Sequence, residues 1–328
     1  MKPFIHPVRT LAILAASACW ALLPGSGAAQ GFPDKPVKVI VTFPPGGTPD
    51  IYGRILAQEL TQLWKQSVVV ENKTGASGTI GTDFVAKAAP DGYTLLFAAD
   101  APITIAPSLY RTLPYNPVRD LTPIVNVASG PFVLLANPAF PASDMKEFIA
   151  LAKQQPGKIS YASSGPGGQQ HLAMESVRHL AGIDVVHIPY KGFGQGLGDV
   201  MAGHVPLIFG GITASIQLTR NGKLKALGVT SAKRSPTLPQ VQAIAETLPG
   251  FRIEAWYGFM GPAAMSRELV AKISADVTAI VRRADFAKRL ADDALDPVPG
   301  TPADFAERIR SDLDGWARLI KAVNVKID

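Results

Sequence analysis

Two glycine-rich segments contain the residues that are best suited to bind an anion. The first, PPGGTPD, covers residues 44–50, and the second, ASSGPGGQQH, covers residues 162–171. Each is expected to join a strand to the N-terminus of a helix. Glycine lets the backbone approach a ligand closely, and a helix N-terminus presents free N–H groups and the positive end of the helix dipole. Each segment is therefore interpreted either as an anion site or as an ordinary turn.

The second segment also contains the residue types of a nucleophile and its base. His171 follows Ser163 and Ser164 closely, so a hydrolytic serine–histidine pair is one interpretation. The alternative is that His171 is a first-turn helix residue whose ring is satisfied by hydrogen bonds. The sequence contains no GxSxG, P-loop or GxGxxG motif. We therefore favour a protein that is not an enzyme.

Neither a metal nor a cofactor is expected. The histidines after residue 29 lack HxxxH or HExxH spacing, and no cysteine follows Cys19. The segment TGASGTIG, residues 74–81, is similar to the cofactor turn of short-chain dehydrogenases. However, Thr79 stands where that pattern has glycine, and no YxxxK follows. The segment is therefore interpreted as another glycine-rich turn that packs beside the first.

Residues 1–29 have the features of a secretory signal peptide. A basic start is followed by an apolar run over residues 11–23 and by the small residues Gly27-Ala28-Ala29. A lipid anchor on Cys19 is the alternative, but the residues before it lack the usual leucine and the apolar run continues beyond it. We expect cleavage after Ala29 and a mature protein in the periplasm.

The composition indicates a globular protein with a large core. The chain has 328 residues, 47% of them hydrophobic, and a formal charge of +6 that becomes +4 without Lys2 and Arg9. About 300 residues follow the leader, which is enough for two domains, and they contain no cysteine, so disulfides do not contribute to stability. The basic residues are scattered, which disfavours a nucleic-acid partner.

Strands and helices are expected to alternate along the chain. A strand over residues 37–42 precedes a helix with Thr48 as N-cap and Pro49 at its first position, ending near Trp64. The strands expected after it are residues 68–71, 94–98, 125–127, 132–136, 158–161, 185–189, 205–209, 226–229 and 251–260. Helices are expected between several of these strands and at the C-terminus. This alternation indicates an α/β protein whose parallel sheets are covered by helices.

Short motifs occur in a characteristic order after residue 29. They are FPDKP at 32–36, PPGG at 44–47, ENK at 71–73, PDGYTL at 90–95, PSLY at 107–110, YASSG at 161–165, PYKG at 189–192, LGVTSAKR at 227–234, LPGF at 248–251 and WYG at 256–258. With this ordered set, the mature chain resembles the periplasmic solute-binding proteins of tripartite tricarboxylate transporters, the TctC-like or Bug family. Each motif is common alone, but the order over nearly 300 residues is specific.

The resemblance implies a Venus-flytrap fold of two α/β domains, each with a mainly parallel sheet, joined by hinge strands. Domain 1 would comprise residues 30–129 and 253–328, and domain 2 would comprise residues 130–252. Members of the family close on a ligand and deliver it to the membrane permease subunits of their transporter. A monomer is expected.

The resemblance also implies that a carboxylate is held between the two glycine turns, largely by backbone N–H groups and bridging waters. The ligand-binding residues predicted in this way are Gly46, Gly47, Thr48, Asp50, Ser163, Ser164, Gly165, Gly168 and His171. An aspartate is unusual beside an anion. Asp50 is therefore expected to bind a ligand ammonium, to order a water or to cap its own helix.

Three positions depart from the pattern of the family. Gly168 stands where serine is usual, Gly210 stands where aspartate is usual, and Pro49 replaces a small polar residue. The backbone contacts to the carboxylate should survive these changes. The loss of polar groups favours a ligand with a less polar or bulkier far end, such as an aromatic or extended carboxylate. A periplasmic sensor that docks on a receptor is the alternative function, because it would use the same ligand trap.

Overall fold

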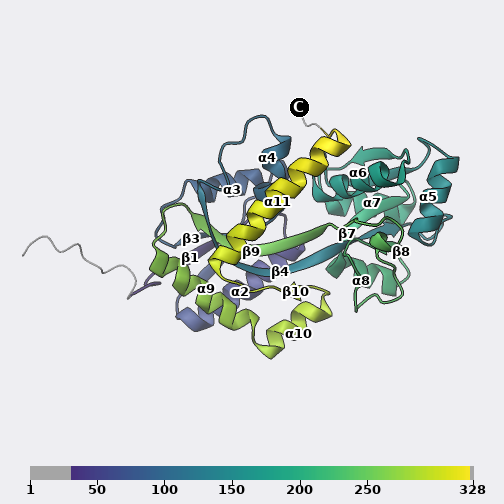
Figure 1. Cartoon of the computed structure of the whole chain (residues 1–328). Coiled ribbons are helices and arrows are strands. Elements are labelled where there is room, and N and C mark those ends of the chain that lie inside the picture. The colour runs from purple at the N-terminus through teal and green to yellow at the C-terminus, as the bar shows by residue number, and fades with distance from the viewer. Residues whose placement is uncertain (1–30, 326–328) are drawn as a thin grey trace, which may run out of the picture.

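The computed structural model describes residues 31–325, so the predicted signal peptide lies outside the described residues. Within this part the predicted α/β architecture is confirmed, because one mixed sheet has helices packed on its faces (Figure 1). Between residues 31 and 325, no helix has the length and apolar character needed to span a membrane.

The first half of the fold contains the parallel strands that the sequence predicted. β1 (Val37–Val41) lies between β2 (Val68–Asn72) and β3 (Thr94–Ala99) and is parallel to both. α2 (Thr48–Trp64) connects β1 to β2, and α3 (Thr79–Ala86) lies between β2 and β3 in the chain. Because parallel strands end at the same edge of a sheet, the segments that follow β1 and β3 lie close together.

Two long strands extend from this half into the other (Figure 1). β4 (Leu121–Ala136) pairs antiparallel with β9 (Glu254–Pro262) along its first part. Along its last part it pairs antiparallel with β7 (Leu207–Gly211) and β8 (Lys225–Val229). These strands add antiparallel pairs to the parallel ones, so the sheet is mixed.

The sequence predicted two short strands, residues 125–127 and 132–136, where the structure has the single strand β4. This prediction was wrong because Gly130 and Pro131 usually interrupt a strand. Here both residues pair with β9, and this pairing keeps the backbone extended through them.

The second half repeats the arrangement of a parallel strand, a glycine turn and a helix. β5 (Ser160–Ser163) lies between β6 (Val186–Pro189) and β7 and is parallel to both. The helices of this half are α5 (Met145–Gln154), α6 (Gln169–Ala181), α7 (Phe193–Ala202) and α8 (Ile212–Arg220). α6 follows the glycine-rich segment after β5, so its N-terminus lies at the carboxyl end of a parallel strand.

The C-terminal elements cover the first half and reach the second. They are α9 (Arg267–Val281), α10 (Ala284–Asp292), the short β10 (Asp296–Pro297) beside β4, and α11 (Pro302–Val323). The short helices Ala76–Gly78, Ala101–Ile105, Ala106–Leu109 (α4) and Ile244–Glu246 complete the described part. α11 runs diagonally across the molecule and contacts both α4 and α6 (Figure 1).

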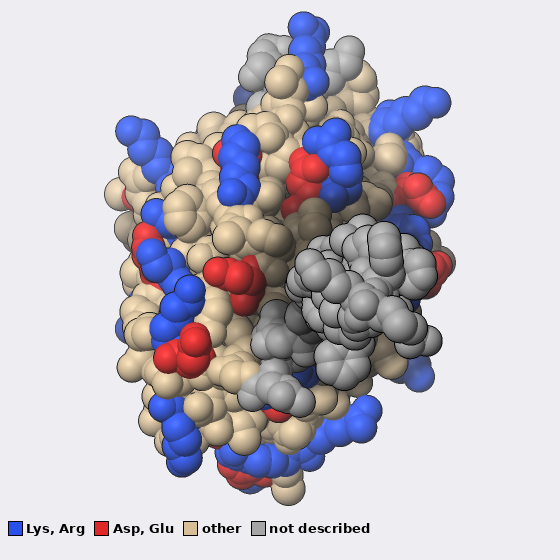
Figure 2. Space-filling view, turned by 90° about the vertical axis from the view of Figure 1, so that its left-hand side faces the viewer, with Lys and Arg blue, Asp and Glu red and all other residues tan. Residues whose placement is uncertain are grey.

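The core and the surface agree with the predicted globular character. The apolar side chains of β1, β3, β4 and β9 are nearly all buried. Trp256 of β9 packs edge-on against Phe305 of α11 with a centroid distance of 4.9 Å, which fixes α11 on the sheet. On the face shown in Figure 2, basic and acidic side chains are interspersed, and no continuous basic surface is present there. The predicted division into two domains stays a prediction.

Candidate functional site

The turn between β1 and α2 is closed by the carboxylate of Asp50. Gly46 has a φ of +87°, a conformation that favours glycine, and its N–H donates to Asp50 Oδ2 at 3.0 Å. Asp50 Oδ1 accepts hydrogen bonds from Arg54 Nε at 3.0 Å and from Asn72 Nδ2 at 2.8 Å. Burial raises the pKa of Asp50, but the hydrogen bonds outweigh it and hold that pKa below its ordinary value. Asp50 therefore closes the turn before α2, whereas the predicted role of capping the helix was wrong, because no side-chain hydrogen bond caps α2.

The start of α2 differs by one residue from the prediction. Gly47 is the N-cap, with an extended backbone (φ −81°, ψ 165°), and Thr48 is the first helical residue, so the assignment of Thr48 as N-cap was wrong. Thr48 already belongs to the helix, and no side-chain hydrogen bond caps the N-terminus of α2. The N–H groups of Gly47, Thr48 and Asp50 have no acceptor within residues 31–325, so they are free to bind an anion.

The segment between β5 and α6 uses most of its own N–H groups internally. The N–H of Ser164 donates to Gln170 Oε1 at 2.9 Å. The N–H of Gly165 donates to Ser163 Oγ at 3.1 Å, and that of Gly167 donates to His171 Nδ1 at 3.0 Å. The N–H of Gly168 lies 3.4 Å from the Gly165 carbonyl oxygen. The amides of Ser164 and Gly165, which the resemblance assigned to the ligand, are therefore already engaged inside the turn.

The free donors of this half lie in the first turn of α6. The N–H groups of Gln169, Gln170 and His171 find no acceptor in the part of the chain that the structure describes. Gly168 is the N-cap, with an extended backbone (φ −66°, ψ 159°). A Cβ on Gly168 would lie 3.5 Å from the Gly165 oxygen, which is ordinary contact, so serine would also fit there. α6 has 13 residues and therefore a well-developed positive end.

Two buried residues connect the N-terminus of α2 with that of α6. Asp100, which directly follows β3, hydrogen-bonds through Oδ2 to the side-chain amide of Gln169. Besides burial, the charge of Asp100 raises the pKa of the Tyr257 phenol in β9, and the nearby side chain of Thr48 lowers it. Thr48 and Gln169 are the first residues of α2 and α6, so both helix ends lie near Asp100 and Tyr257.

The connecting residues are suited to stand beside an anion. Burial raises the pKa of Asp100 well above its ordinary value, and the negative charge of Asp312 adds to this effect. Asp100 therefore keeps its proton to a higher pH than an exposed aspartate, and a neutral carboxyl does not repel a carboxylate. Burial also raises the pKa of Tyr257, and the charge that Asp100 carries once it is ionised adds to this effect. The phenol therefore stays a hydrogen-bond donor.

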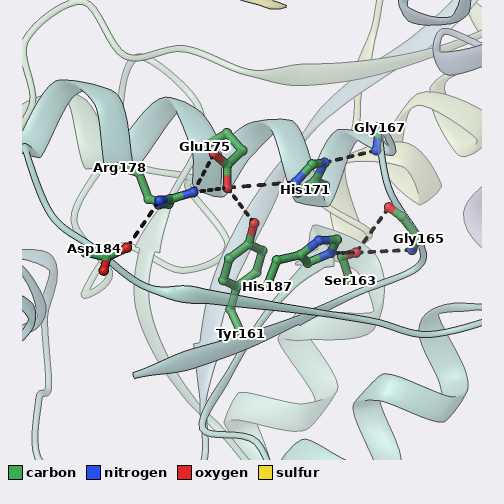
Figure 3. Close-up of polar contacts among 9 residues, drawn as sticks. All are labelled: Tyr161, Ser163, Gly165, Gly167, His171, Glu175, Arg178, Asp184 and His187. Carbon is green, nitrogen blue, oxygen red and sulfur yellow. Dashed lines mark hydrogen bonds and ion pairs between the residues drawn. The ribbon is translucent and has the colours of Figure 1, made fainter. Parts of the chain in front are cut away.

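A network of aromatic and charged side chains lies behind the turn before α6 (Figure 3). Its members are Tyr161, Ser163, Gly165, Gly167, His171, Glu175, Arg178, Asp184 and His187. His187 Nε2 lies 2.6 Å from Ser163 Oγ, and the rings of His187 and His171 stack with a centroid distance of 4.1 Å. His171 is thus a hydrogen-bonded first-turn residue, and it forms no hydrogen bond with Ser164 in the described structure. The proposed Ser164–His171 nucleophile pair is absent.

Four residues of this region were not predicted from the sequence: Asp100, Gln169, His187 and Tyr257. Asp100 could have been found from its place directly after a predicted strand, and Gln169 from its place directly after Gly168. Tyr257 belongs to the WYG motif, but only the pairing of Tyr257 with Ala99 places it beside Asp100. No sequence signal indicated His187, because it lies on β6 and reaches Ser163 across the β5–β6 pairing.

The two glycines that depart from the family pattern differ in their surroundings. A Cβ on Gly210 would lie 2.9 Å from Ser215 Oγ and 3.2 Å from the Cζ atom of Phe193. An aspartate would therefore require the Phe193 ring to move. Beside Gly210 the chain has the aromatic ring of Phe193 and no charged group, whereas a Cβ on Gly168 would make only ordinary contacts.

Two α/β halves are joined by long strands, and each half has a helix N-terminus whose first N–H groups find no acceptor among residues 31–325, an arrangement that agrees with a solute-binding protein. The chain belongs to the tripartite tricarboxylate transporter receptor family, TctC, whose family model matches residues 52–325. Receptors of this family are periplasmic substrate-binding proteins, and the family is not an enzyme family.

Known relatives support this assignment over almost the whole chain. The protein BugT of Bordetella pertussis is 32% identical over 325 residues, covering 98% of this chain and 100% of BugT. The structure of Rpa4515 of R. palustris with adipate has a TM-score of 0.86 at 30% identity, covering 90% of this chain and 99% of that one. MatC of Rhodopseudomonas palustris with bound malate has a TM-score of 0.81 at 30% identity, covering 88% and 100%. The predicted family is therefore confirmed.

Proposed function

We propose that this protein binds a small carboxylate between the N-termini of α2 and α6 and delivers it to the permease subunits of a tripartite tricarboxylate transporter. In this proposal the protein acts in the periplasm after its signal peptide has been removed. The carboxylate accepts hydrogen bonds from the free amides of Gly47 and Thr48 on one side. The free amides of Gln169 and Gln170 contact it from the other side.

One observation carries this proposal. The first residue of α6, Gln169, hydrogen-bonds Asp100, and both Asp100 and the first residue of α2, Thr48, act on the pKa of Tyr257, which supports a shared site for the two helix ends. Each helix end stabilises negative charge with backbone dipoles and N–H groups, without a buried lysine or arginine. Such a site binds an anion without a charged side chain. When the ligand leaves, no buried positive charge remains without a partner, which suits reversible capture.

The structure also supports a ligand class. Rpa4515 and MatC were solved with adipate and malate, which are both dicarboxylates. In this chain Phe193 fills the space beside Gly210, where the family usually has aspartate. We therefore propose an extended carboxylate whose chain is apolar or aromatic beyond the bound carboxyl group.

A thermal-shift screen of the mature protein, residues 30–328, tests the proposal. The panel contains malate, adipate, longer dicarboxylates, benzoate and the corresponding amides as uncharged controls. A carboxylate at a hundredfold above its dissociation constant should stabilise the protein by about 2.7 kcal/mol, which gives a melting shift of several degrees. Equal shifts with a carboxylate and its amide, or no shift with any carboxylate, would contradict the proposed ligand class.

The transport step needs a separate experiment in the source organism. Deletion of the gene should abolish uptake of the radiolabelled carboxylate that gives the largest melting shift. Uptake should return with the wild-type gene but not with a gene that encodes Gly47→Val. Unchanged uptake in the deletion strain would favour the sensor alternative over transport.

A further inference from the structure

The ring of His171 is bonded in a way that only its neutral form allows. Its Nδ1 accepts a hydrogen bond from the N–H of Gly167 at 3.0 Å. A backbone N–H can only donate, so Nδ1 carries no proton and the proton of the neutral ring is on Nε2. That nitrogen faces Glu175 Oε1 at 3.8 Å. A second proton would have to enter at Nδ1 and would break the bond to Gly167.

His187 holds the other side of the same turn. Its Nε2 lies 2.6 Å from Ser163 Oγ, and this oxygen accepts the N–H of Gly165 at 3.1 Å. The Ser163 hydroxyl also contacts the Gly165 carbonyl oxygen at 3.1 Å. The two imidazoles, which stack at 4.1 Å, therefore fix Gly165 and Gly167, and Gly165 and Gly167 precede the free amides of α6 (Figure 3).

The surroundings of the pair disfavour a positive charge on either ring. Burial lowers the pKa of His171, although the carboxylate of Glu175 opposes this effect. Burial lowers the pKa of His187, and the neighbouring ring of His171 lowers it further, to about 4. The other titratable groups that face the pair are Tyr161 of β5 and Arg178 of α6. Arg178 and Tyr161 both interact with Glu175, so that carboxylate is largely engaged elsewhere.

We propose that His171 and His187 are positioning residues for the ligand site: their stacked rings hold the turn before α6, and protonation of His171 at Nδ1 breaks its bond to Gly167 and releases the turn and the ligand. This inference rests on the proposed carboxylate site at the N-terminus of α6. It adds that ligand affinity depends on the protonation state of a ring, that of His171, which faces away from the proposed ligand contacts and acts through the turn. The ligand would be bound at neutral pH and released in acid.

Nuclear magnetic resonance of the ligand-free mature protein tests the first part. We expect a neutral His171 with its proton on Nε2, and titration midpoints below 6.5 for both rings. Amide exchange at Gly165 and Gly167 should accelerate as the rings become protonated. The proposal is overturned if His171 titrates with a normal midpoint, or if the two amides exchange at a rate that does not follow its titration.

Ligand affinity in matched variants tests the second part. His171→Asn keeps an acceptor near the position of Nδ1, and His187→Gln keeps a polar group near that of Nε2, but neither can become charged. With adipate as the probe, the wild-type dissociation constant should rise steeply below pH 5, by up to roughly tenfold per pH unit for one linked proton. The double variant should lack this additional rise. Protonation of adipate itself affects both proteins equally, so the ratio of their dissociation constants isolates the histidines.

His179→Gln is the matched control, because His179 is an exposed histidine of the same helix. It should keep the pH dependence of the wild type. His171→Leu, which removes the acceptor for Gly167, should weaken binding about tenfold or more at pH 7.5 as well. A double variant with the same pH dependence as the wild type would refute the proposal. If adipate and the rest of the panel fail to bind at pH 7.5, the proposed function fails, whereas the resonance titration still decides whether the rings control the turn.

Discussion

The side chain of Gln169, the first residue of α6, hydrogen-bonds the buried carboxyl of Asp100, which directly follows β3. Asp100 belongs to the first half of the fold and Gln169 to the second, so this bond connects the carboxyl ends of two separate sets of parallel strands. Ligand capture between the halves would depend on how firmly this contact holds them together.

Asp100→Asn should change the pH dependence of stability. The pKa of Asp100 is raised in the folded protein, so the folded state binds a proton that the unfolded state releases above about pH 3.8. The contribution of this group to stability is therefore present at low pH and is lost as the pH rises towards the folded pKa. Asparagine is neutral at every pH, so the variant should gain melting temperature relative to the wild type between pH 4 and pH 8.

The control for this measurement is Asp314→Asn, at an exposed position of α11. Its melting temperature should stay close to that of the wild type over the same range. A constant difference between Asp100→Asn and the wild type from pH 4 to pH 8 would show that Asp100 has an ordinary pKa.

Asp50→Ala should destabilise the protein and weaken ligand binding together. The substitution leaves the N–H of Gly46 and the side chains of Arg54 and Asn72 without their common acceptor. Gly46 and Arg54 are exposed, so water can replace the lost acceptor, and the expected loss is about 0.5–1.5 kcal/mol, which chemical denaturation can measure. Asp50→Asn retains one acceptor oxygen and should lose less. Equal stability of Asp50→Ala and the wild type would mean that the turn does not depend on this carboxylate.

Gly47→Val should abolish ligand binding and leave the fold intact. Gly47 has a negative φ, and a Cβ there would lie 3.7 Å from the nearest atom, Pro49 Cδ, so a side chain can be accommodated. The branched side chain would nevertheless cover the free amides at the start of α2. The melting shift produced by adipate should disappear, while circular dichroism remains unchanged. Wild-type affinity in a folded Gly47→Val protein would place the anion elsewhere.

Gly46→Ala separates backbone strain from ligand contact. No atom lies within 4 Å of a Cβ at Gly46, so the substitution causes no clash, but the φ of +87° costs an alanine roughly 1–2 kcal/mol. We expect the free energy of unfolding to fall. The affinity for the ligand should stay nearly normal at a temperature where the variant is folded. Gly315→Ala, at an open position inside α11, should instead stabilise the protein by up to about 1 kcal/mol. The two free energies of unfolding should therefore move in opposite directions.

The sequence by itself determined the local elements and the family. Alternating β-branched residues placed β1, and the helical spacing of apolar residues placed the end of α2 at Trp64, because these signals arise from interactions within one element. The ordered motifs identified the solute-binding family, since their order over nearly 300 residues is specific although each motif is common alone. The glycine turns before α2 and α6 were found in the same way.

Only the tertiary structure decided which groups are free to bind. A sequence shows that Ser164, Gly165 and Gly167 have N–H groups, but not that Gln170, Ser163 and His171 accept them. The free donors consequently lie in the first turn of α6.

The same limit applies to contacts between elements that are distant in the chain. Ser163 and His187 meet across a strand pair, and Asp100 meets Gln169 across the two halves. Gly130 and Pro131 remain extended because β9 pairs with them. Local sequence specifies a residue's chemistry and its own backbone preferences, whereas hydrogen-bond partners, burial and the pKa of a buried group depend on what packing brings beside it.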